Sequence, residues 1–494
     1  EPATDQTFDV RNIAPQIASI ERATPATSVT NGDSLTWRFT FAQIDNSFSL
    51  PTSAFTVTGT TATVTSVSRF SIGFDVTVSG GDLASLNGDV SIGLTNSNFA
   101  DDYGNVMDRT IPAGAELTYS LDNTGPRIAS IERFSPTAER ASNDTVRWRV
   151  TFNEAVNNVT ADDFTVTGTT GVLSVSNLTT TTVDLDLSGG DMAGLNGTVT
   201  LAVAGGQDVA DSAGNLLTNT TPTGANDNTF VMDNTPPRIA SVVRQSSASQ
   251  YTNLDSITWR VTFNEDVSGV DATKFGLTVP FDVNSGSITQ SVAQISASVY
   301  DVTAAGGDLV AMNGEIALRI FTTVNDLAFN TMTDATPTGA SELSYTVDNA
   351  GPDAFGIYRA NPTAEATNAD TLQWAISVDP QFSGDVFIDA STVNPADFTL
   401  TGPTGATLSI SVVTNAGEST ATIFVTASGG DLATYDGTVA LGIAPGQDMR
   451  DLAGNPVTTS LANGSQSFSL DNTVPTLVSL VRQSRPEQTP MPTA

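Results

Sequence analysis

The sequence contains no cysteine and no histidine, and Lys274 is its only lysine. Without cysteine the chain forms no disulfide and offers no thiolate nucleophile. Without histidine it has no Ser-His-Asp arrangement and no ordinary zinc or haem site. Oxygen atoms are therefore the metal ligands that remain, and oxygen ligands suit hard cations, above all Ca²⁺.

Positive charge of any kind is scarce. The 494 residues include 53 Asp and Glu against 19 Lys and Arg, which gives a formal net charge of −34. Nucleic acids and anionic membrane surfaces are bound through basic patches, so we expect neither as a partner. No apolar run approaches the ~18 residues of a membrane span, so no direct membrane insertion of this segment is expected.

One phrase returns along the chain and defines a repeat. It reads APQIASIERATP at its first appearance, and its proline recurs at intervals of 111, 111, 115 and 123 residues, at Pro15, Pro126, Pro237, Pro352 and Pro475. All four tryptophans fall on one repeat position, Trp37, Trp148, Trp259 and Trp374. A residue that large, used once per unit, is expected at the centre of each unit's core.

The repeat predicts four complete domains and two fragments. We expect Ig-like domains over 15–125, 126–236, 237–351 and 352–474, the last strand of a preceding domain over 1–14, and the first strand of a following domain over 475–494. The two fragments match the closing and opening segments of a repeat, which favours a window on a longer array.

Within each unit the apolar residues alternate with polar ones. Val146, Trp148, Val150 and Phe152 are an example. This period of two is typical of strands with one buried face, as in an antiparallel sandwich. About seven strands per unit are expected, the number of an Ig-type sandwich. The segment from Gly80-Gly81-Asp82 to Asn87-Gly88, which recurs in every unit, predicts one helical turn with Asp82 as its N-cap.

These motifs resemble the tandem bacterial Ig-like domains of large surface adhesins and some S-layer proteins. The carriers are Val-Thr-Phe-Asn-Glu at 150–154 and 261–265, Asp-Phe-Thr-Val-Thr-Gly at 163–168, and Asp-x-Ala-Gly-Asn at 211–215 and 451–455. The resemblance covers essentially the whole chain. It implies an all-β fold, a tandem array of seven-stranded Ig-like antiparallel β-sandwiches.

The resemblance also implies a function. The expected role is a non-catalytic extender of an extracellular or cell-surface adhesin, a rod of repeats that projects a binding region from the cell. Two alternatives stay open: a subunit of an S-layer or extracellular filament, and an accessory region of a polysaccharide-active enzyme. The expected partners are neighbouring repeats of the same chain and lateral or end-to-end copies of it.

The acidic segments are the one group of residues whose spacing suggests a binding site. In a seven-strand sandwich the turn between the last two strands and the segment after the tryptophan strand meet at the pole where the chain enters through Asp-Asn. Calcium takes six to eight oxygens in loose geometry and is the expected ion there. The candidate ligands are Asp122, Asn123, Glu154, Asp208, Asp211, Asp233, Asn234, Glu265, Asp326, Asp348, Asn349, Asp379, Asp448 and Asp451.

A second interpretation is that these Asp and Asn side chains cap their own turns and bind no ion. The first and fourth repeats depart from the pattern, because Gln43 and Pro380 stand where Glu154 stands in the second. Arg11 replaces the linker aspartate at the first junction, where we expect the weakest binding. Paired carboxylates also cleave glycosides. The acids here recur in every unit, however, so no catalytic residue and no enzymatic activity are expected.

Overall fold

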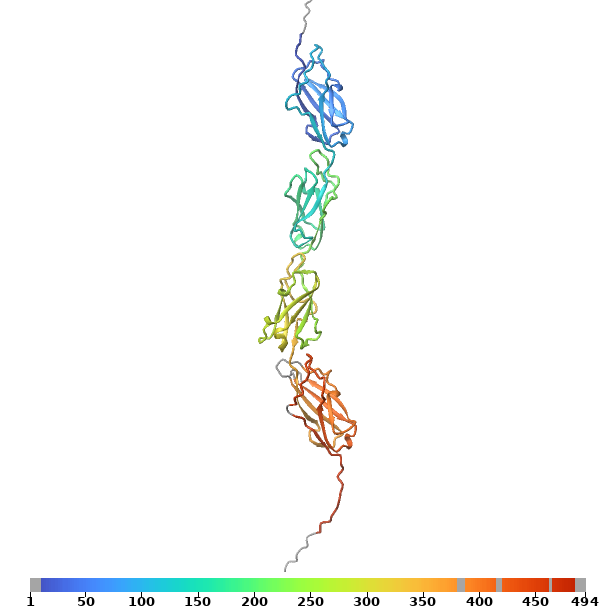
Figure 1. Ribbon diagram of the computed structural model, residues 1–494, viewed down its shortest axis with the longest axis vertical. Helices are drawn as coiled ribbons and strands as arrows, with labels where there is room; N and C mark the ends of the chain where they lie inside the picture. The colour runs from blue at the N-terminus through green and yellow to red at the C-terminus, as the bar shows by residue number, and fades with distance from the viewer. Residues whose placement is uncertain (1–9, 380–386, 415–419, 462–463, 485–494) are drawn as a thin grey trace, which may run out of the picture. The chain divides into compact units, whose positions relative to one another are not determined.

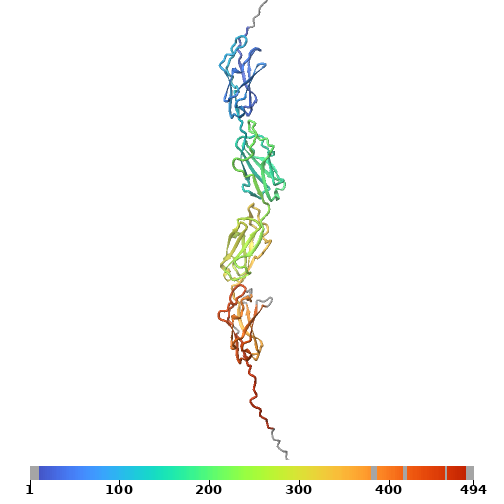
Figure 2. The same cartoon turned by 90° about the vertical axis from the view of Figure 1, so that its right-hand side faces the viewer.

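The computed structural model describes residues 10–379, 387–414, 420–461 and 464–484 (Figure 1). By internal contacts the chain divides into two units, Glu1–Thr235 with Ala328–Asn330, and Pro236–Leu327 with Thr331–Ala494. The described residues are built from β-strands and short 3-10 turns, and the perpendicular view in Figure 2 shows the same strands and loops. The all-β expectation is therefore confirmed.

Unit 1 holds two sandwiches. The first has the sheets β1-β3-β6-β5 and β2-β8-β7-β4. Its elements are β1 (Ile17–Thr24), β2 (Val29–Thr30), β3 (Ser34–Phe41), η1 (Thr52–Ala54), β4 (Phe55–Thr58), β5 (Thr63–Phe70), β6 (Gly73–Ser79), η2 (Leu83–Ser85), β7 (Gly88–Leu94) and β8 (Thr118–Leu121).

The second sandwich of unit 1 has the sheets β13-β14-β11-β9 and β10-β16-β15-β12. Its elements are β9 (Ile128–Ser135), β10 (Arg140–Ala141), β11 (Thr145–Phe152), η3 (Ala161–Asp163), β12 (Phe164–Thr167), β13 (Val172–Ser176), β14 (Thr182–Ser188), η4 (Met192–Gly194), β15 (Gly197–Val203) and β16 (Thr229–Met232).

Unit 2 holds the third and fourth sandwiches. The third has the sheets β17-β19-β23-β22 and β18-β26-β24-β21 and a short pair β20-β25. Its elements are β17 (Ile239–Arg244), β18 (Tyr251–Thr252), β19 (Ser256–Phe263), β20 (Val267–Ser268), η5 (Ala272–Lys274), β21 (Phe275–Thr278), η6 (Ser285–Ser287), β22 (Thr289–Ser296), β23 (Val299–Ala305), η7 (Gly307–Ala311), β24 (Gly314–Ile320), β25 (Asn325–Asp326) and β26 (Ser344–Val347).

The fourth sandwich has the sheets β27-β29-β32-β31 and β28-β34-β33-β30. Its elements are β27 (Asp353–Asn361), β28 (Ala366–Thr367), β29 (Thr371–Asp379), η8 (Pro395–Asp397), β30 (Phe398–Thr401), β31 (Thr407–Thr414), β32 (Ala421–Ser428), η9 (Leu432–Thr434), β33 (Gly437–Ile443) and β34 (Phe468–Leu470). Of the two expected terminal fragments, residues 1–9 and 485–494 lie outside the described residues.

Among the described residues each sandwich has two four-stranded sheets, which together make eight strands where the sequence predicted about seven, and the third sandwich adds the pair β20-β25. The difference arises in the first strand, which is broken in two. Its first part pairs with the tryptophan strand, as β9 pairs antiparallel with β11. Its second part crosses to the other sheet, where β10 pairs parallel with β16. One predicted strand therefore contributes an edge to both sheets.

The core of each sandwich is centred on its tryptophan, as expected. Trp37, Trp148, Trp259 and Trp374 are all fully buried. Each indole meets an aromatic ring of the last strand edge to face, with centroids 4.8–5.2 Å apart, at Tyr119, Phe230, Tyr345 and Phe468. The partner belongs to the opposite sheet, so the contact joins the two layers across the core.

The helical turn after the Gly-Gly-Asp segment is present as a single 3-10 turn in each sandwich, η2, η4, η7 and η9. Asp82 is the N-cap residue of η2, as predicted, and its carbonyl accepts from the N–H of Ser85 at 3.0 Å, but its side chain accepts no hydrogen bond from η2. It accepts instead from the backbone N–H of Thr61, at 2.9 Å, and from the Thr60 hydroxyl. Asp82 thus starts the turn through its backbone, while its side chain fixes the loop between two strands.

Candidate metal centre

The Asp-x-Ala-Gly-Asn turn of the second sandwich is organised around one buried carboxylate. Asp211, 5% exposed, accepts hydrogen bonds on Oδ1 from the backbone N–H groups of Ala213, at 2.8 Å, and Asn215, at 2.9 Å. Its Oδ2 accepts from the Asn215 amide at 2.8 Å. Gly214 lies at φ +96°, a conformation that favours glycine. The motif therefore closes on itself, as the turn-capping interpretation predicted.

Asn215 also ties this turn to the first sandwich, which belongs to the same unit. Its amide donates to the backbone carbonyl of Asp122 in the linker at 2.7 Å. Its side-chain oxygen accepts from Asn31, the residue after β2, at 3.1 Å, and the backbone N–H of Asn31 donates to Ala213 at 3.3 Å. A single asparagine thus connects the turn, the linker and the preceding sandwich.

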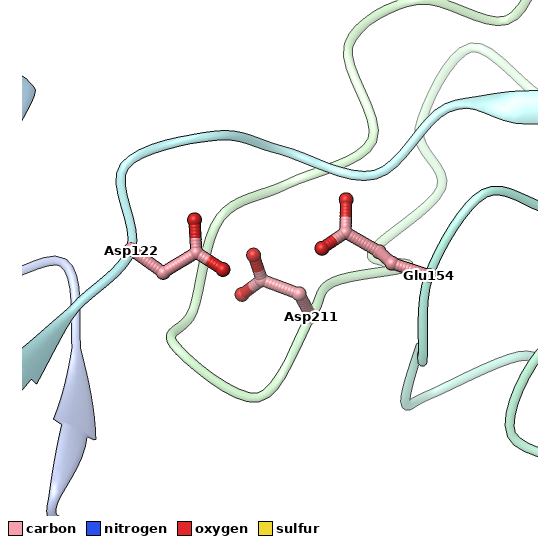
Figure 3. Close-up of side chains that lie close together, drawn as sticks. All are labelled: Asp122, Glu154 and Asp211. Atoms are coloured by element: carbon pink, nitrogen blue, oxygen red, sulfur yellow. The ribbon is translucent and has the colours of Figure 1, made fainter. Parts of the chain in front are cut away.

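Three carboxylates from separate segments converge beside this turn (Figure 3). Asp122 follows β8, and its backbone N–H donates to the carbonyl of Thr30. Glu154 follows β11, and Asp211 lies on the turn described above. One oxygen from each of the three residues lies within 4.8 Å of the others. The pole where the chain enters the second sandwich therefore collects three of the four acids that the strand order predicted there, without Asp208.

The electrostatics of the group follow from its like charges. Partial burial raises the pKa of Glu154, and the negative charges of Asp122 and Asp211 raise it further, against a lowering hydrogen bond from Asn153. In the absence of a cation the ionised form of Glu154 is thus less stable than that of an isolated glutamate. A bound cation would reverse that preference.

The residues present fit a hard divalent cation. Carboxylate oxygens are the ligands that calcium prefers. Asp211 Oδ2 accepts one hydrogen bond in the structure and keeps a lone pair, since a carboxylate oxygen accepts two. Asp122 uses Oδ1 for the N–H of Thr124 at 3.0 Å, and its Oδ2 is the oxygen open to an ion. The turn can therefore keep its hydrogen bonds while it coordinates a cation.

A matching turn lies between the third and fourth sandwiches, both in unit 2. Asp451, 2% exposed, accepts from the backbone N–H and the amide of Asn455, at 2.8 and 2.9 Å. The Asn455 amide donates to the carbonyl of Asp348 at 2.8 Å, and Asn253 donates to Asn455 at 3.0 Å. Burial raises the pKa of Asp451, and the nearby charge of Asp348 adds to the rise.

The first sandwich repeats the same turn without the acidic linker. The Asn105 amide donates to Asp101 and to the carbonyl of Arg11, both at 2.9 Å. The guanidinium of Arg11 lies over the Tyr103 ring, 5.8 Å from its centroid. The backbone connection is thus kept where a positive side chain replaces the aspartate.

Several predicted ligands take other positions. Asp208 and Asp448 are exposed, and Asp208 is not a member of the three-carboxylate group. The amides of three asparagines cap the 3-10 turn of their own sandwich: Asn123 bonds the carbonyls of Leu83 and Leu86, Asn234 those of Met192 and Leu195, and Asn349 those of Leu309 and Met312.

The remaining predicted ligands are placed within their own units. In unit 1, Asp233 follows β16 and accepts from the N–H of Thr235 at 3.2 Å. In unit 2, Glu265 accepts from the Asn264 amide at 3.3 Å. Asp326 is buried on β25, and Asp379 ends β29 with the Ser377 hydroxyl at 3.3 Å. Pro380, predicted to weaken the fourth site, lies outside the described residues.

Sequence reasoning missed the asparagines that make the inter-sandwich contacts. Asn215 and Asn455 end the Asp-x-Ala-Gly-Asn motif, so the motif itself was the available signal. Their partners Asn31 and Asn253 follow the short strands β2 and β18. Both lie six residues before a tryptophan, Trp37 and Trp259, so this shared repeat position was a second available signal.

No protein-family model and no curated protein matches the chain. Among solved structures it is similar to invasin, described as a bacterial integrin-binding protein, with 12% identity and a TM-score of 0.30 over 86% of this chain and 75% of that one. It is also similar to the S-layer protein SbsC, with 13% identity and a TM-score of 0.19 over 91% of this chain and 55% of that one.

A third similar structure is the extracellular region of plexin A4, with 7% identity and a TM-score of 0.20 over 86% of this chain and 46% of that one. The similarity to bacterial adhesins and S-layer proteins, first seen in the sequence motifs, thus recurs among solved structures. Scores of this size carry no argument about function. Among the described residues, no helix combines the length and the apolar character that crossing a membrane requires.

Proposed function

We propose that this chain is a non-catalytic extender segment of a bacterial cell-surface or secreted adhesin, in which Ig-like repeats in series hold a binding region away from the cell. The observation that carries the proposal is the course of the chain through each sandwich. The first and last strands are parallel neighbours, as β10 and β16 are. The chain therefore enters a sandwich at one end and leaves it at the other.

The linkers support the same role. Only a few residues separate β8, which ends at Leu121, from β9, which begins at Ile128. Within that stretch the Asp122 carbonyl is held by Asn215 and the Asn123 amide by η2. A short linker bonded to the sandwiches on both sides gives adjacent repeats little freedom. High negative charge also keeps copies of such a chain apart and soluble.

The test is the size of the chain in solution. Four sandwiches of roughly 35–40 Å in series reach on the order of 150 Å, which corresponds to a radius of gyration of about 43 Å. A compact globule of this length has a radius of gyration of about 23 Å. Small-angle scattering of the full chain distinguishes the two, and a value near the globular one would refute the extender.

We also propose that calcium binds at the junctions and stiffens them, most strongly at Asp122, Glu154 and Asp211. The support is the convergence of three carboxylates within 4.8 Å, together with the raised pKa of Glu154. The first junction, with Arg11 and Gln43, is expected to bind most weakly. Calcium would neutralise the mutual repulsion of the carboxylates and join the linker to the second sandwich.

Calorimetric titration of the full chain with Ca²⁺ tests this proposal. Glu154→Gln should reduce the affinity of one site at least tenfold, because it removes one of three charges. The matched control is Glu132→Gln, an acid of β9 in the same sandwich that is not a member of the group. Equal affinities in both variants, or an unchanged scattering curve and melting temperature after chelation, would contradict calcium binding. The acidic side chains would then only cap their own turns.

The absence of catalysis is part of the proposal. Each acidic turn has counterparts in other repeats, whereas an active site is normally built once in a cleft. The purified chain should turn over no glycoside or ester. An activity that disappears when one unrepeated acid is changed would contradict this and favour the accessory-region alternative.

Assembly into a lattice or filament is the second candidate. Residues 474–481 expose a run of apolar side chains, with Leu477, Val478 and Leu480 at 79%, 93% and 87%. Their sequence repeats the opening strand of each sandwich, so an edge strand of another copy is a suitable partner. Light scattering over a range of concentrations tests this, with Val478→Asp as the variant that should abolish association.

A further inference from the structure

The first and last strands of every sandwich form a contact that we call the terminal seam. In the second sandwich it joins residues 127–141 to residues 219–233. The short strands β2, β10, β18 and β28 pair parallel with β8, β16, β26 and β34. The longer first strand adds parallel bridges to the segment before the last strand, such as Ile131 with Asn226.

Backbone hydrogen bonds run along the whole seam. In the second sandwich six N–H groups donate across it at 2.8–3.1 Å: Thr223 to Ile128, Gly224 to Ala129, Ile131 to Ala225, Asp227 to Ile131, Val231 to Glu139 and Asp233 to Ala141. The bonds join two segments that run in the same direction. They connect the strand through which the chain enters the sandwich to the strand through which it leaves.

Tension between the two ends of the chain acts on all the hydrogen bonds of the terminal seam at once. When the ends of a sandwich are pulled apart, two parallel neighbours must slide past each other along their length. The bonds between them are then strained at the same time. An antiparallel pair pulled at its open end loses its bonds one after another. Forced unfolding is governed by the unfolding rate, so the bonds that break first set the resistance.

An arginine at one repeat position crosses the seam in each sandwich. Arg133, with 18% of its side chain exposed, donates to the carbonyl of Thr229 at 3.1 Å and lies 3.4 Å from the Asp227 carboxylate. The equivalent residues donate to the equivalent carbonyls at 2.8–3.2 Å: Arg22 to Thr118, Arg244 to Ser344 and Arg359 to Ser467.

The acidic partner of this arginine also recurs in the first three sandwiches. Glu116 lies 2.9 Å from Arg22, and Glu342 lies 3.6 Å from Arg244. In the fourth sandwich Gln466 holds that place and accepts from the backbone N–H of Arg359 at 3.0 Å. A chain with only 19 basic residues thus places one of them on each seam.

We propose that Arg22, Arg133, Arg244 and Arg359 act as latches that delay the sliding of the terminal seam when the chain is under tension. The inference rests on the proposed function, which puts the chain under tension between its ends. It adds the residues that set the resistance of each sandwich to that tension. Arg359 of the fourth sandwich should be the weakest of the four latches, because its acidic partner, Glu365 at 3.8 Å, belongs to the first-strand side of the seam, and the neutral Gln466 stands across it.

Single-molecule stretching of the full chain tests the proposal. Because the chain has no cysteine, one cysteine added at each end gives a unique attachment. At constant force the four sandwiches should open as four events. Arg133→Met should speed one of these events about tenfold, since it removes the hydrogen bond to Thr229 and the ion pair with Asp227 from one seam. Arg147→Met is the control, because Arg147 pairs with Asp186 between the antiparallel strands β11 and β14.

The control should change the opening rate by less than about threefold, although both variants lose an arginine pair of one sandwich. Equal acceleration by the two variants would contradict the role of Arg133 as a latch. It would leave the extender proposal intact, because small-angle scattering tests the extender separately. Opening of all unmodified sandwiches at negligible force would contradict load bearing itself.

A change of pulling direction tests the seam without altering it. Val172 and Ser188 are paired at the open end of the antiparallel strands β13 and β14. A chain held through Val172→Cys and Ser188→Cys should begin to extend at a lower force than one held by its ends, because these bonds are lost one at a time. An equal or higher force in this direction would refute the role of the parallel seam.

Discussion

The entry turns of the second and fourth sandwiches have the same hydrogen bonds and different surroundings. Asp211 and Asp451 each accept from an asparagine four residues later, and Asn215 and Asn455 each donate to a linker carbonyl. Around Asp211 a third carboxylate, Glu154, completes a group within 4.8 Å. The same hydrogen-bonded turn therefore recurs in both sandwiches, while among the described residues the number of acids grouped around it differs.

This comparison separates two roles that the sequence motif combines. The asparagine connection is also present at Asn105, where the linker residue is Arg11. It does not depend on a carboxylate in the linker. Any role in binding cations must come from the additional acids, and so must differ from one junction to the next. The experiments below test where the two sandwiches are alike and where they diverge.

Removing the central indole should have the largest effect in both sandwiches. Trp148→Ala should lower the free energy of unfolding of the second sandwich by about 3–5 kcal/mol, because it leaves a cavity in a closed core. Trp374→Ala should cost at least as much, since its indole also donates to the Gln466 carbonyl at 3.0 Å. Urea unfolding measures both, and Val172→Ala, at an exposed position, should change little.

Removing the asparagine connection should have the next largest effect. Asn455→Ala should cost about 1–3 kcal/mol, since it leaves buried partners such as Asp451 without their hydrogen bonds. Asn215→Ala should lie nearer the lower limit, because Asn215 is only half-buried. Calorimetric melting of the full chain measures the losses. Asn46→Ala, at an exposed asparagine, is the control, and equal losses in all three variants would contradict the role of the connection.

The acid that distinguishes the second sandwich should give it a pH dependence. The pKa of Glu154 is raised above its ordinary value of 4.5. The folded state then holds its proton to higher pH than the unfolded state does. Without metal, stability should therefore fall as pH rises from about 4.5 through the raised pKa. The fall should stay below about 1 kcal/mol because solvent screens the site.

Glu154→Gln should remove that fall, and bound calcium should reverse its sign, because calcium binds the ionised carboxylates. Melting temperatures measured across pH, with chelator and with calcium, give the two curves. A metal-free curve that rises with pH through this window in the unmodified chain and not in Glu154→Gln would show that the Glu154 charge stabilises the empty junction, against this prediction.

The smallest effect is expected from exchanging a solvent-facing pair between the two sandwiches. Arg147 faces Asp186 in the second sandwich, and Gln373 faces Thr426 at the same place in the fourth. Arg147→Gln combined with Asp186→Thr should change the free energy of unfolding by less than about 0.5 kcal/mol, because the ion pair is only partly buried and a glutamine and a threonine can bond there at 3.0 Å, as Gln373 and Thr426 do. A loss above 2 kcal/mol would show that this face takes part in more than a surface pair.

The sequence predicted the features that repeat with a regular period. Alternating apolar residues around Trp148 gave the buried face of β11, and strand order brought Glu154 and Asp211 to one pole. The broken first strand was not predictable in the same way. Its second part, β10, is only two residues long, Arg140 and Ala141. Two residues show no period, and their pairing with β16 depends on a distant part of the chain.

The sequence predicted which types of residue form the candidate site better than it predicted which individual residues belong to it. Asp208 and Asp211 look alike in the sequence, yet Asp208 is exposed and Asp211 is 5% exposed. Side-chain direction on a turn depends on its hydrogen bonds, and the local pattern does not contain those. Asn123 likewise reads as a linker ligand, but its amide is used by the carbonyls of Leu83 and Leu86.

Pairing the first strand with the last also determines when a repeat can fold during synthesis. The seam of the second sandwich joins Ile131 to Asn226, so the early strand waits for its partner until almost the whole repeat has left the ribosome. Contacts this distant in sequence place all-β domains among the slow folders, at milliseconds to seconds. Each repeat should therefore stay open while it is made and then close as one unit, before the next repeat is complete.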